Sequence, residues 1–370
     1  MKNKITFDNN TVLKQFHSHI ACSKEKHLLE ILNGSELCPQ LLTHSESCLE
    51  TEYISGITLA QAISEQYDVK HIFQLLLEWV MKFNTVAGDI VLDDINLKNF
   101  IYSPVQDKVY GMDFECWHNG DSRMNIASVC GLISESRFTD TDLQAELYKF
   151  IREKAVCPGV CSGKQLDNYI DAYRSKVQLR RKAMPLIRQS DCVIIAGGKS
   201  SRMGQPKGLL EYNGFSFVQH IIYNTSVFDR QYISANSDIY NHLGCEIIAD
   251  DHKDIGPLGA LEACIRKSNS EYVFFIPCDM PFINEETIFR LYSQLTYDAD
   301  AVVMTAEGRV FPTVAVYRKN VLPLIEGLIE TENYRLMELL DRINTVYVQR
   351  EHPQQFGNIN TPQDYKKIIK

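Results

Sequence analysis

The sequence predicts two domains, the second of which, residues 188–370, is a three-layer α/β domain with a mainly parallel sheet. Three observations predict this. The chain has 370 residues, more than one hydrophobic core usually supports. From Cys192 onward, apolar strand-like runs alternate with helical patterns, which is typical of parallel strands covered by helices on both faces. Polar or glycine-rich segments follow these runs, at the sheet edge where ligands bind.

The first predicted domain, residues 1–187, has a mostly helical pattern with a few short strands. Amphipathic helices are expected from about Leu143 to Ala155 and from Lys164 to Ala183. Pro185 should end the second helix, because proline lacks the N–H group and clashes with the preceding turn. The run from Asp107 to Asp113 is one of the short predicted strands.

Composition narrows the class of protein. The chain has 45% hydrophobic and 23% charged residues, as ordinary globular proteins do, and its formal net charge of -9 disfavours non-specific nucleic-acid binding. The basic run at residues 180–182 is interpreted as a solvated helix face. The eleven cysteines include no Cys-x-x-Cys pair, so reduced thiols are expected. No signal peptide or membrane span is recognised, and a cytoplasmic location is expected.

Apolar runs define the predicted strands of the second domain: Cys192 to Ala196, Gln231 to Ala235, Glu246 to Ala249, Tyr272 to Ile276 and Ala301 to Met304. The first run is followed by a glycine-rich loop, and the next three by Asn236, Asp250 and Asp279. Because the carboxyl ends of parallel strands share one edge of a sheet, these polar groups are expected to converge there.

The glycine-rich loop has the composition of a phosphate-binding segment. Gly197, Gly198 and Gly204 can adopt backbone angles closed to other residues, and their amide groups can approach a phosphate closely. Arg202 and Lys207 supply positive charge for a triphosphate. An isolated Gly-Gly pair would more simply form a tight turn, so the interpretation depends on the whole string.

Two common phosphate motifs do not fit this loop, since Val193 stands where a Walker loop needs its first glycine and no G-x-G-x-x-G fingerprint is present. The string from Ile195 to Lys207 instead resembles the signature of sugar-nucleotide-type nucleotidyltransferases, and specifically that of the molybdenum cofactor guanylyltransferases. The resemblance covers about residues 190–370 and implies a Rossmann-like nucleotidyltransferase fold. It includes four more motifs: Gly256 to Gly259, Phe275 to Pro281, Phe311 to Ala315 and Asn358 to Pro362.

The resemblance also implies roles for individual residues. Backbone groups of the first loop would contact the nucleotide, Lys207 would bind its phosphates, and Arg202, Lys207 and Asp279 would support catalysis. The remaining nucleotide-binding residues would be Ile195, Ala196, Gly197, Gly198, Asn236, Asp250 and Asp279. Asn358 and Asn360 would lie near the pterin-side substrate, although without the resemblance they could equally well only shape their loop.

Asp279 is the predicted ligand of Mg²⁺. It closes a strongly apolar strand, and a carboxylate at that edge can hold a hard cation through oxygen. Helix capping does not explain it, because Pro281 disfavours a helix running on from Asp279 and Asn284 is a better N-cap for the next helix.

The reaction implied by the resemblance is transfer of GMP from GTP to molybdenum-molybdopterin with release of pyrophosphate. GTP and molybdenum-molybdopterin would be the substrates, and molybdenum-insertion proteins and apo-molybdoenzymes would be partners. The alternatives are a molybdopterin cytidylyltransferase and a nucleotide-sensing scaffold. Ala-Gly-Gly at 196–198 favours the guanylyl branch, since cytidylyl relatives tend to carry Ala-Ala-Gly, and intact Lys207 and Asp279 disfavour the scaffold.

The N-terminal half resembles a small, atypical protein-kinase-like α+β fold of the bacterial type. The resemblance implies a Lys14–Glu25 ion pair, Asp94 as the catalytic-loop base, and Asn99 and Asp113 as metal ligands.

This half also departs from the kinase pattern. The first 33 residues contain no glycine, Leu92 stands where the catalytic-loop histidine would be, and Glu115 replaces the last glycine of Asp-Phe-Gly. A degenerate module that binds nucleotide or a partner, an active kinase and an inert helical domain all remain open.

Overall fold

The computed structural model describes residues 3–8, 10–135, 141–156, 161–198, 203–350 and 357–369. The chain divides into two compact units, Lys2–Val177 and Gln178–Lys370, so the division falls inside helix α6 (Gly163–Ile187). The domain bounds 1–187 and 188–370, which place the division after this helix, stay a prediction.

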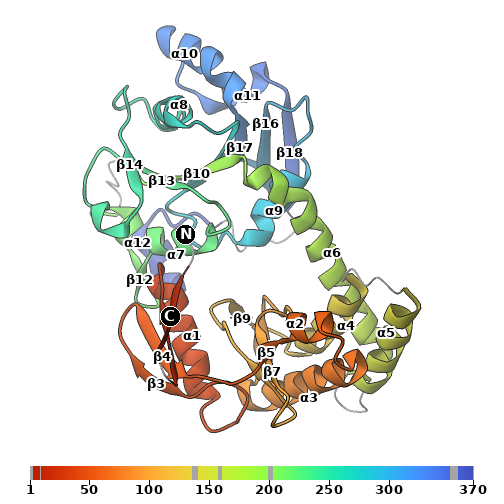
Figure 1. Ribbon diagram of the computed structural model, residues 1–370. Helices are drawn as coiled ribbons and strands as arrows, with labels where there is room; N and C mark the ends of the chain where they lie inside the picture. The colour runs from red at the N-terminus through yellow and green to blue at the C-terminus, as the bar shows by residue number, and fades with distance from the viewer. Residues whose placement is uncertain are drawn as a thin grey trace. The chain divides into compact units, whose positions relative to one another are not determined.

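The C-terminal unit is built on a seven-stranded sheet with strand order β14-β13-β10-β15-β17-β16-β18 (Figure 1). The first four strands in this order are mutually parallel, β17 is antiparallel to both neighbours, and β18 is parallel to β16. The sheet is therefore mainly parallel, as predicted, although β17 and β18 are not among the predicted runs. In chain order the strands are β10 (Ser190–Ile195), β13 (Gln231–Ser234), β14 (Glu246–Ile248), β15 (Tyr272–Pro277), β16 (Ala301–Ala306), β17 (Arg309–Arg318) and β18 (Thr345–Arg350).

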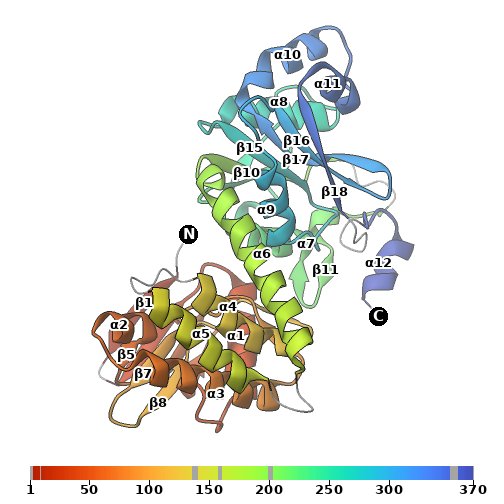
Figure 2. The same cartoon turned by 90° about the vertical axis from the view of Figure 1, so that its right-hand side faces the viewer.

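Helices cover both faces of this sheet (Figure 2). Alternate residues of β10 enter two separate cores: Cys192 and Ile194 pack with α6, α7 and α9, and Val193 packs with α8, α10 and α11. The three predicted layers are thus confirmed. The covering helices after α6 are α7 (Phe217–Asn224), α8 (Pro257–Lys267), α9 (Glu285–Ser293), α10 (Leu322–Glu330) and α11 (Leu336–Arg342), and a small hairpin, β11 (Glu211–Tyr212) and β12 (Phe215–Ser216), and α12 (Pro362–Ile368) complete the unit.

The N-terminal unit contains more strand structure than its mostly helical pattern suggests. An antiparallel sheet of order β1-β2-β4-β3 is interrupted in sequence by α1, and two smaller sheets, β5-β7-β8 and β6-β9, follow. The helical patterns near 143–155 and 164–183 do form α5 and α6. The elements are β1 (Lys4–Asp8), β2 (Thr11–Gln15), α1 (His19–Ile31), β3 (Leu41–His44), β4 (Cys48–Glu52), β5 (Ile57–Thr58), α2 (Leu59–Ser64), α3 (Val69–Ala87), β6 (Ile90–Leu92), β7 (Phe100–Ser103), β8 (Lys108–Gly111), β9 (Trp117–Asn119), α4 (Arg123–Glu135) and α5 (Thr141–Ala155).

The prediction that Pro185 ends the second long helix is wrong, because α6 runs on to Ile187 with Pro185 inside it. Ala183 and Ile187, on either side of the proline, are fully buried in the core of the C-terminal unit. Their burial favours continuing the helix and offsets the backbone hydrogen bond that proline cannot donate.

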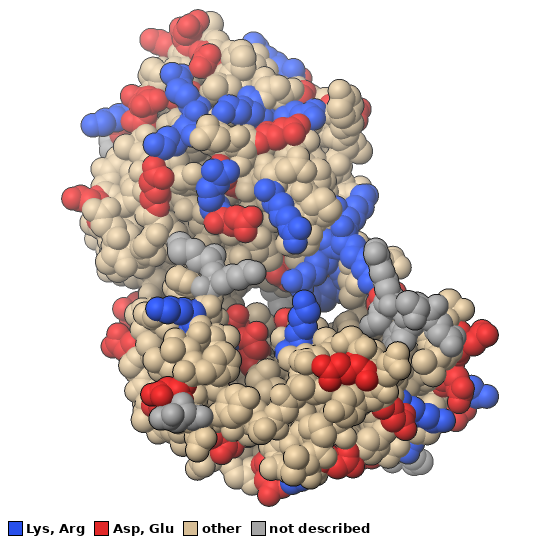
Figure 3. Space-filling view, viewed as in Figure 1, with Lys and Arg blue, Asp and Glu red and all other residues tan. Residues whose placement is uncertain are grey.

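The described residues show how surface charge, cysteines and apolar helices are distributed in the structure. On the face that Figure 3 shows, acidic and basic side chains are interspersed over most of the surface, and residues 180–182 are exposed on α6. The ten cysteines in the described part of the chain are free thiols. None of the described helices is long and apolar enough to cross a membrane.

Candidate functional site

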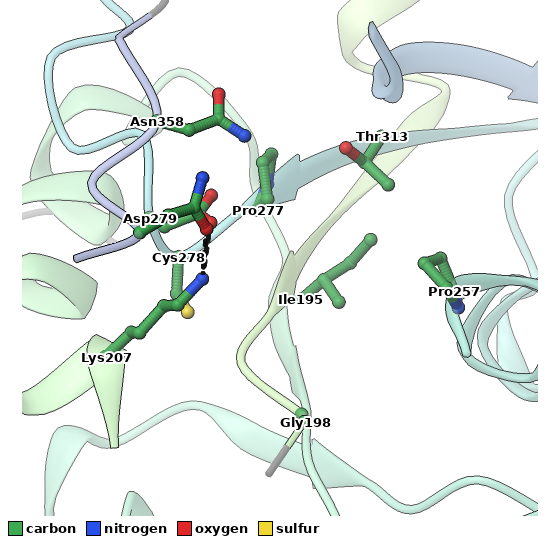
Figure 4. A pocket seen from close by; sticks show the side chains of 11 residues that line it. Ile195, Gly198, Lys207, Pro257, Pro277, Cys278, Asp279, Thr313 and Asn358 are labelled. Carbon is green, nitrogen blue, oxygen red and sulfur yellow. Dashed lines mark hydrogen bonds and ion pairs between the residues drawn. The ribbon is translucent and has the colours of Figure 1, made fainter. Parts of the chain in front are cut away.

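A pocket of about 330 Å³ lies at the carboxyl edge of the C-terminal sheet (Figure 4). Its volume is at the lower end of the range for small-molecule sites. Five separate parts of the chain contribute to it, as expected for a site at the edge of a parallel sheet. The lining residues are Ile195, Gly197, Gly198, Lys207, Pro257, Pro277, Cys278, Asp279, Thr313, Asn358 and Asn360.

The glycine-rich loop begins where β10 ends. Gly198 has a φ of 115°, a backbone conformation that residues with a Cβ rarely adopt. At Gly197 an added Cβ would meet the Ser234 carbonyl oxygen, at 3.8 Å, an ordinary contact and the only one with the described part of the chain. Both glycines therefore present bare backbone to the pocket, but only Gly198 needs glycine for its conformation.

Lys207, Asp279 and Asn360 meet inside this pocket. The Lys207 ammonium group donates to Asp279 Oδ2, at 3.0 Å, and to Asn360 Oδ1. These residues are far apart in the chain, and both the lysine and the carboxylate are largely shielded from solvent. The structure thus brings together a predicted phosphate ligand, the predicted metal ligand and a predicted substrate-side residue.

Asp279 is placed by the end of β15, a strand whose first five residues are buried. The Cys278 N–H donates to the Ile195 carbonyl at 2.9 Å, and the Ile359 N–H donates to the Asp279 carbonyl at 3.1 Å. Asn284 caps α9 by accepting from the Thr287 N–H, as predicted, so Asp279 is not needed as a cap.

One carboxylate oxygen of Asp279 is available to a ligand. Asp279 is 9% exposed, and its Oδ1 is buried without a hydrogen-bond partner among the described residues. A buried, unpartnered carboxylate oxygen is costly unless something binds it. A divalent cation that prefers oxygen ligands, as Mg²⁺ does, fits this atom.

The loop that carries Asn358 and Asn360 is fixed by the start of α12. Thr361 and Asp364 form a capping box, and the Asp364 carboxylate also accepts from the Asn360 N–H at 3.3 Å. Ile359, between the two asparagines, is buried with Leu210 and Phe217. The start of α12 therefore holds both asparagine side chains at the pocket.

Three predicted residues within the described part of the chain are not in the pocket lining: Ala196, Asn236 and Asp250. Asn236 and Asp250 bind one another, since the Asn236 side-chain amide donates to Asp250 Oδ2 and the Asp250 N–H donates to Asn236 Oδ1, both at 2.9 Å. They follow neighbouring strands β13 and β14, but neither lines the pocket. Arg202 lies outside the described residues.

Four lining residues had no predicted role: Pro257, Pro277, Cys278 and Thr313. Burial raises the pKa of the Cys278 thiol to about 12, so this cysteine is not a nucleophile near neutral pH. Thr313 belongs to the motif Phe311 to Ala315. Proline inside a strand indicates an irregular strand, so Pro312 was a signal in the sequence that could have pointed to this residue.

In the N-terminal unit, three carboxylates surround one lysine, and we call Lys14, Glu25, Asp113 and Glu115 the Lys14 cluster. Lys14 on β2 contacts Glu25 on α1 at 2.6 Å, also contacts Asp113, and lies 3.7 Å from Glu115. Burial raises the pKa of Glu25 to about 7, against the attraction of Lys14. Burial lowers the pKa of Lys14, but the three carboxylates outweigh it and raise that pKa overall.

The other two residues of this predicted constellation also lie together. The Asn99 side-chain amide donates to the Asp94 carbonyl at 3.1 Å and to the Asp94 carboxylate at 3.2 Å. The Asn99 carbonyl accepts from the Met112 N–H at 2.8 Å, beside Asp113. Asp113 has a φ of 62°, which is uncommon for a residue with a side chain and often marks a functional site.

Comparison with known proteins concerns the C-terminal unit. The family described as "MobA-like NTP transferase domain" matches residues 192–346. A molybdenum cofactor guanylyltransferase of Vibrio parahaemolyticus is 34% identical to this chain, over 48% of this chain and 93% of that protein. A probable molybdenum cofactor guanylyltransferase of Carboxydothermus hydrogenoformans is 30% identical, again over 48% of this chain and 93% of that protein. The similarity spans nearly the whole of each relative and about half of this chain.

A solved structure is also similar to the same share of the chain. It is molybdopterin-guanine dinucleotide biosynthesis protein A from Archaeoglobus fulgidus, with 23% sequence identity and a TM-score of 0.43. The match covers 48% of this chain and 96% of that one.

Proposed function

Because this chain belongs to the molybdenum cofactor guanylyltransferase family, we propose that it transfers GMP from GTP to molybdenum-molybdopterin and releases pyrophosphate. Membership makes the chain a nucleotidyltransferase, and the residues of the transferase lie in the C-terminal unit. The products would be the guanine dinucleotide form of the molybdenum cofactor and pyrophosphate.

The contact between Lys207 and Asp279 is the observation that carries this proposal. It places a cation and a carboxylate with a spare buried oxygen in one pocket, beside the bare backbone of Gly197 and Gly198. A triphosphate with Mg²⁺ needs these groups: amides and an ammonium ion for the phosphate oxygens, and a carboxylate for the metal.

The reaction joins two anions, so the main task of the protein is to position them and to neutralise charge. A phosphate oxygen of the pterin attacks the α-phosphorus of GTP, and the bond from that phosphorus to the leaving pyrophosphate breaks. Lys207 would donate to phosphate oxygens and stabilise the charge that builds there. Asp279 would hold Mg²⁺, which when bound supplies further charge neutralisation. No side-chain nucleophile is needed.

Nucleotide choice tests the guanylyl assignment. In calorimetric titrations of the full chain with magnesium and each of GTP, CTP, ATP and UTP, we expect GTP to bind most tightly. The reaction itself is tested by chromatography of the product formed from GTP and molybdenum-loaded molybdopterin. Tightest binding of CTP would instead point to the cytidylyl branch, and binding without any turnover would point to the nucleotide-sensing scaffold.

For the N-terminal unit we propose a second function, a kinase-like nucleotide-binding module with little or no phosphotransfer. Two observations favour it: the contacts of Lys14 with Glu25 and Asp113, and the hydrogen bonds from Asn99 to Asp94. The resemblance implies the Lys14–Glu25 pair, and it implies Asp94 as a base and Asn99 and Asp113 as metal ligands. Glu115, where the pattern has glycine, adds a third carboxylate beside Lys14, which opposes the approach of phosphate.

Tryptophan fluorescence can test this module in the full chain, because the two tryptophans, Trp79 and Trp117, both belong to the N-terminal unit. A fluorescent ATP analogue that accepts energy from tryptophan should give a saturable signal with magnesium. Lys14→Met should weaken binding about tenfold or more, the size expected for loss of a charged hydrogen bond. Lys26→Met, which removes a half-buried lysine of the same unit outside the Lys14 cluster, is the matched control. Equal binding by both variants would exclude this site.

The proposed function also assigns a role to each domain and implies partner proteins. We propose that residues 1–187 and 188–370 act as the module and the transferase, and that the product passes to molybdenum-insertion proteins and apo-molybdoenzymes. Co-purification of the full chain with such proteins is the direct measurement.

A further inference from the structure

Beside the pocket, a short part of strand β17 is paired with neither of its neighbouring strands. Its ladder with β15 ends at the pair Phe275–Ala315, although β15 itself continues to Pro277. Its ladder with β16 passes from the pair Val303–Ala315 directly to Met304–Phe311. Residues 312–314 therefore belong to neither ladder and form a bulge in a central strand. Bulges next to a site commonly redirect a side chain.

Contacts of buried side chains stabilise the bulge. Tyr317 is fully buried, and its hydroxyl donates to the Pro312 carbonyl at 2.8 Å. The Tyr317 ring packs edge-on against Phe275, with ring centroids 5.9 Å apart. Val314 is fully buried, and Pro312 has no N–H group to leave unpaired. These contacts fix the backbone on both sides of Thr313.

Thr313 is the residue that the bulge presents to the pocket. It lines the pocket, and Figure 4 shows its hydroxyl pointing toward Asn358, with Pro277 between them. Among the described residues, no hydrogen bond uses this hydroxyl. Strand β17 thus holds at the pocket the Thr313 hydroxyl, which makes no hydrogen bond with the described residues.

The position of Thr313 indicates which substrate it meets. In Figure 4, Gly198 lies at the opposite end of the view from Thr313 and Asn358. The glycines and Lys207 have the chemistry for the nucleotide phosphates, so the Thr313 end is left for the acceptor. The acceptor must bring a phosphate monoester, which is rich in hydrogen-bond acceptors, to the Asp279 region of the same pocket.

We propose that the Thr313 hydroxyl donates a hydrogen bond to the phosphate of the acceptor substrate and that Tyr317 positions Thr313 through the Pro312 carbonyl. This inference rests on the proposed guanylyl transfer and adds a specificity residue to it. Thr313 selects and orients the second substrate, with no part in nucleotide binding.

The test compares steady-state kinetics of the full chain carrying Thr313→Val, which keeps the shape of threonine but removes the hydroxyl, and Thr313→Ser, which keeps the hydroxyl. For Thr313→Val we expect kcat/KM for molybdenum-loaded molybdopterin to fall about tenfold to a hundredfold, the factor for a hydrogen bond to a charged group. Most of the change should be in KM, and the Kd for GTP measured by calorimetry should stay at the wild-type value. Thr313→Ser should retain most of the wild-type kcat/KM.

Tyr317→Phe separates positioning from structure. It should raise the acceptor KM by a smaller factor and leave the Kd for GTP unchanged. The double variant should be no worse than Thr313→Val alone, because Tyr317 acts through Thr313. An additive loss in the double variant would overturn the positioning role of Tyr317.

The remaining outcomes separate this inference from the proposed function. Turnover by wild type together with an unchanged acceptor KM in Thr313→Val overturns the inference alone. An equal loss of GTP affinity in Thr313→Val also overturns it, because the hydroxyl would then serve the nucleotide. Failure of wild type to turn over molybdenum-loaded molybdopterin defeats the proposed function, and the inference with it.

Discussion

The pocket of the C-terminal unit and the Lys14 cluster of the N-terminal unit both set a lysine against carboxylates, but they leave different atoms available. Lys207 donates to one carboxylate and to the side-chain oxygen of one amide, and Asp279 keeps a buried oxygen without a partner among the described residues. Lys14 has three carboxylates around it. A site with a spare ligand atom is prepared for a cation and its substrate, whereas in the Lys14 cluster the single lysine is already engaged by carboxylates.

The backbone near the two lysines also differs between the two units, because only one of them has glycines there. Gly197 and Gly198 line the C-terminal pocket, where amides can reach phosphate. The first 33 residues of the chain contain no glycine, so strands β1 and β2 offer no comparable loop to the N-terminal site. We therefore expect transfer chemistry in one unit and at most nucleotide binding in the other.

Removing the charge of Asp279 should have the largest effect. Asp279→Asn keeps the size of the side chain, so the fold should be nearly unchanged, but the metal loses its carboxylate ligand. Guanylyl transfer should fall about a hundredfold or more, as for other preorganised electrostatic groups. The measurement is transfer to molybdenum-loaded molybdopterin, with excess magnesium expected to restore part of the rate. Wild-type turnover by the variant would refute the metal site, and loss of activity through early melting, seen by circular dichroism, would make Asp279 structural.

The charge balance around Lys14 can be measured through pH. Because burial raises the Glu25 pKa from 4.5 to about 7, the folded state binds more protons than the unfolded state across that window. The contribution of Glu25 to stability is therefore present below pH 4.5 and is lost as pH rises through 7. Relative to Glu25→Gln, the unfolding free energy of wild type should fall by on the order of 2 kcal/mol between pH 5 and 8.

Denaturant unfolding of the full chain, followed by tryptophan fluorescence, makes this measurement in the N-terminal unit. Glu30→Gln, which removes an exposed carboxylate of α1, should show the pH dependence of wild type. A pH-independent difference between wild type and Glu25→Gln would mean that Glu25 is ionised throughout.

A single methyl group at Gly197 should change nucleotide preference. Among the described residues there is room for it, since the added Cβ would meet no atom but the Ser234 carbonyl oxygen, at 3.8 Å, and the φ of Gly197 is not positive. The methyl would project into the pocket and recreate the Ala-Ala-Gly string of cytidylyl relatives. We expect the ratio of GTP to CTP affinity to fall about tenfold, the size of a one-methyl discrimination. Calorimetry with both nucleotides checks this, and an unchanged ratio would show that Gly197 does not contact the base.

The smallest expected signal is phosphotransfer by the N-terminal unit. Full-length Asp279→Asn protein, in which the C-terminal site is impaired, should incorporate no more label from radioactive ATP than a sample without protein. The reason is the absence of a glycine loop and the third carboxylate beside Lys14. Robust incorporation that disappears on adding Asp113→Ala would show that the N-terminal unit is an active kinase and would remove the contrast between the units.

Local chemistry in the sequence was sufficient to predict several features of the C-terminal unit. Apolar runs placed the first five strands of the seven-stranded sheet, and the capping signal at Asn284 placed the start of α9. Parallel strands must align their carboxyl ends, so the convergence of the glycine-rich loop with Asp279 followed from the predicted parallel sheet. These features depend on residues close together in the chain, and their physical signals are correspondingly local.

Tertiary structure decided what depends on residues far apart in the chain. Pro185 remains inside α6 because Ala183 and Ile187 are buried in a core that the helix sequence does not contain. The contact of Lys207 with Asn360 joins opposite ends of the C-terminal unit, and Asn236 with Asp250 turned to each other and away from the pocket lining. Thr313 lines the pocket because of a bulge in β17, which pairs with β15 and with β16 over different stretches. Packing and register are properties of the assembled sheet, so a local signal such as Pro312 can indicate an irregular strand but not which side chain the bulge brings to the pocket.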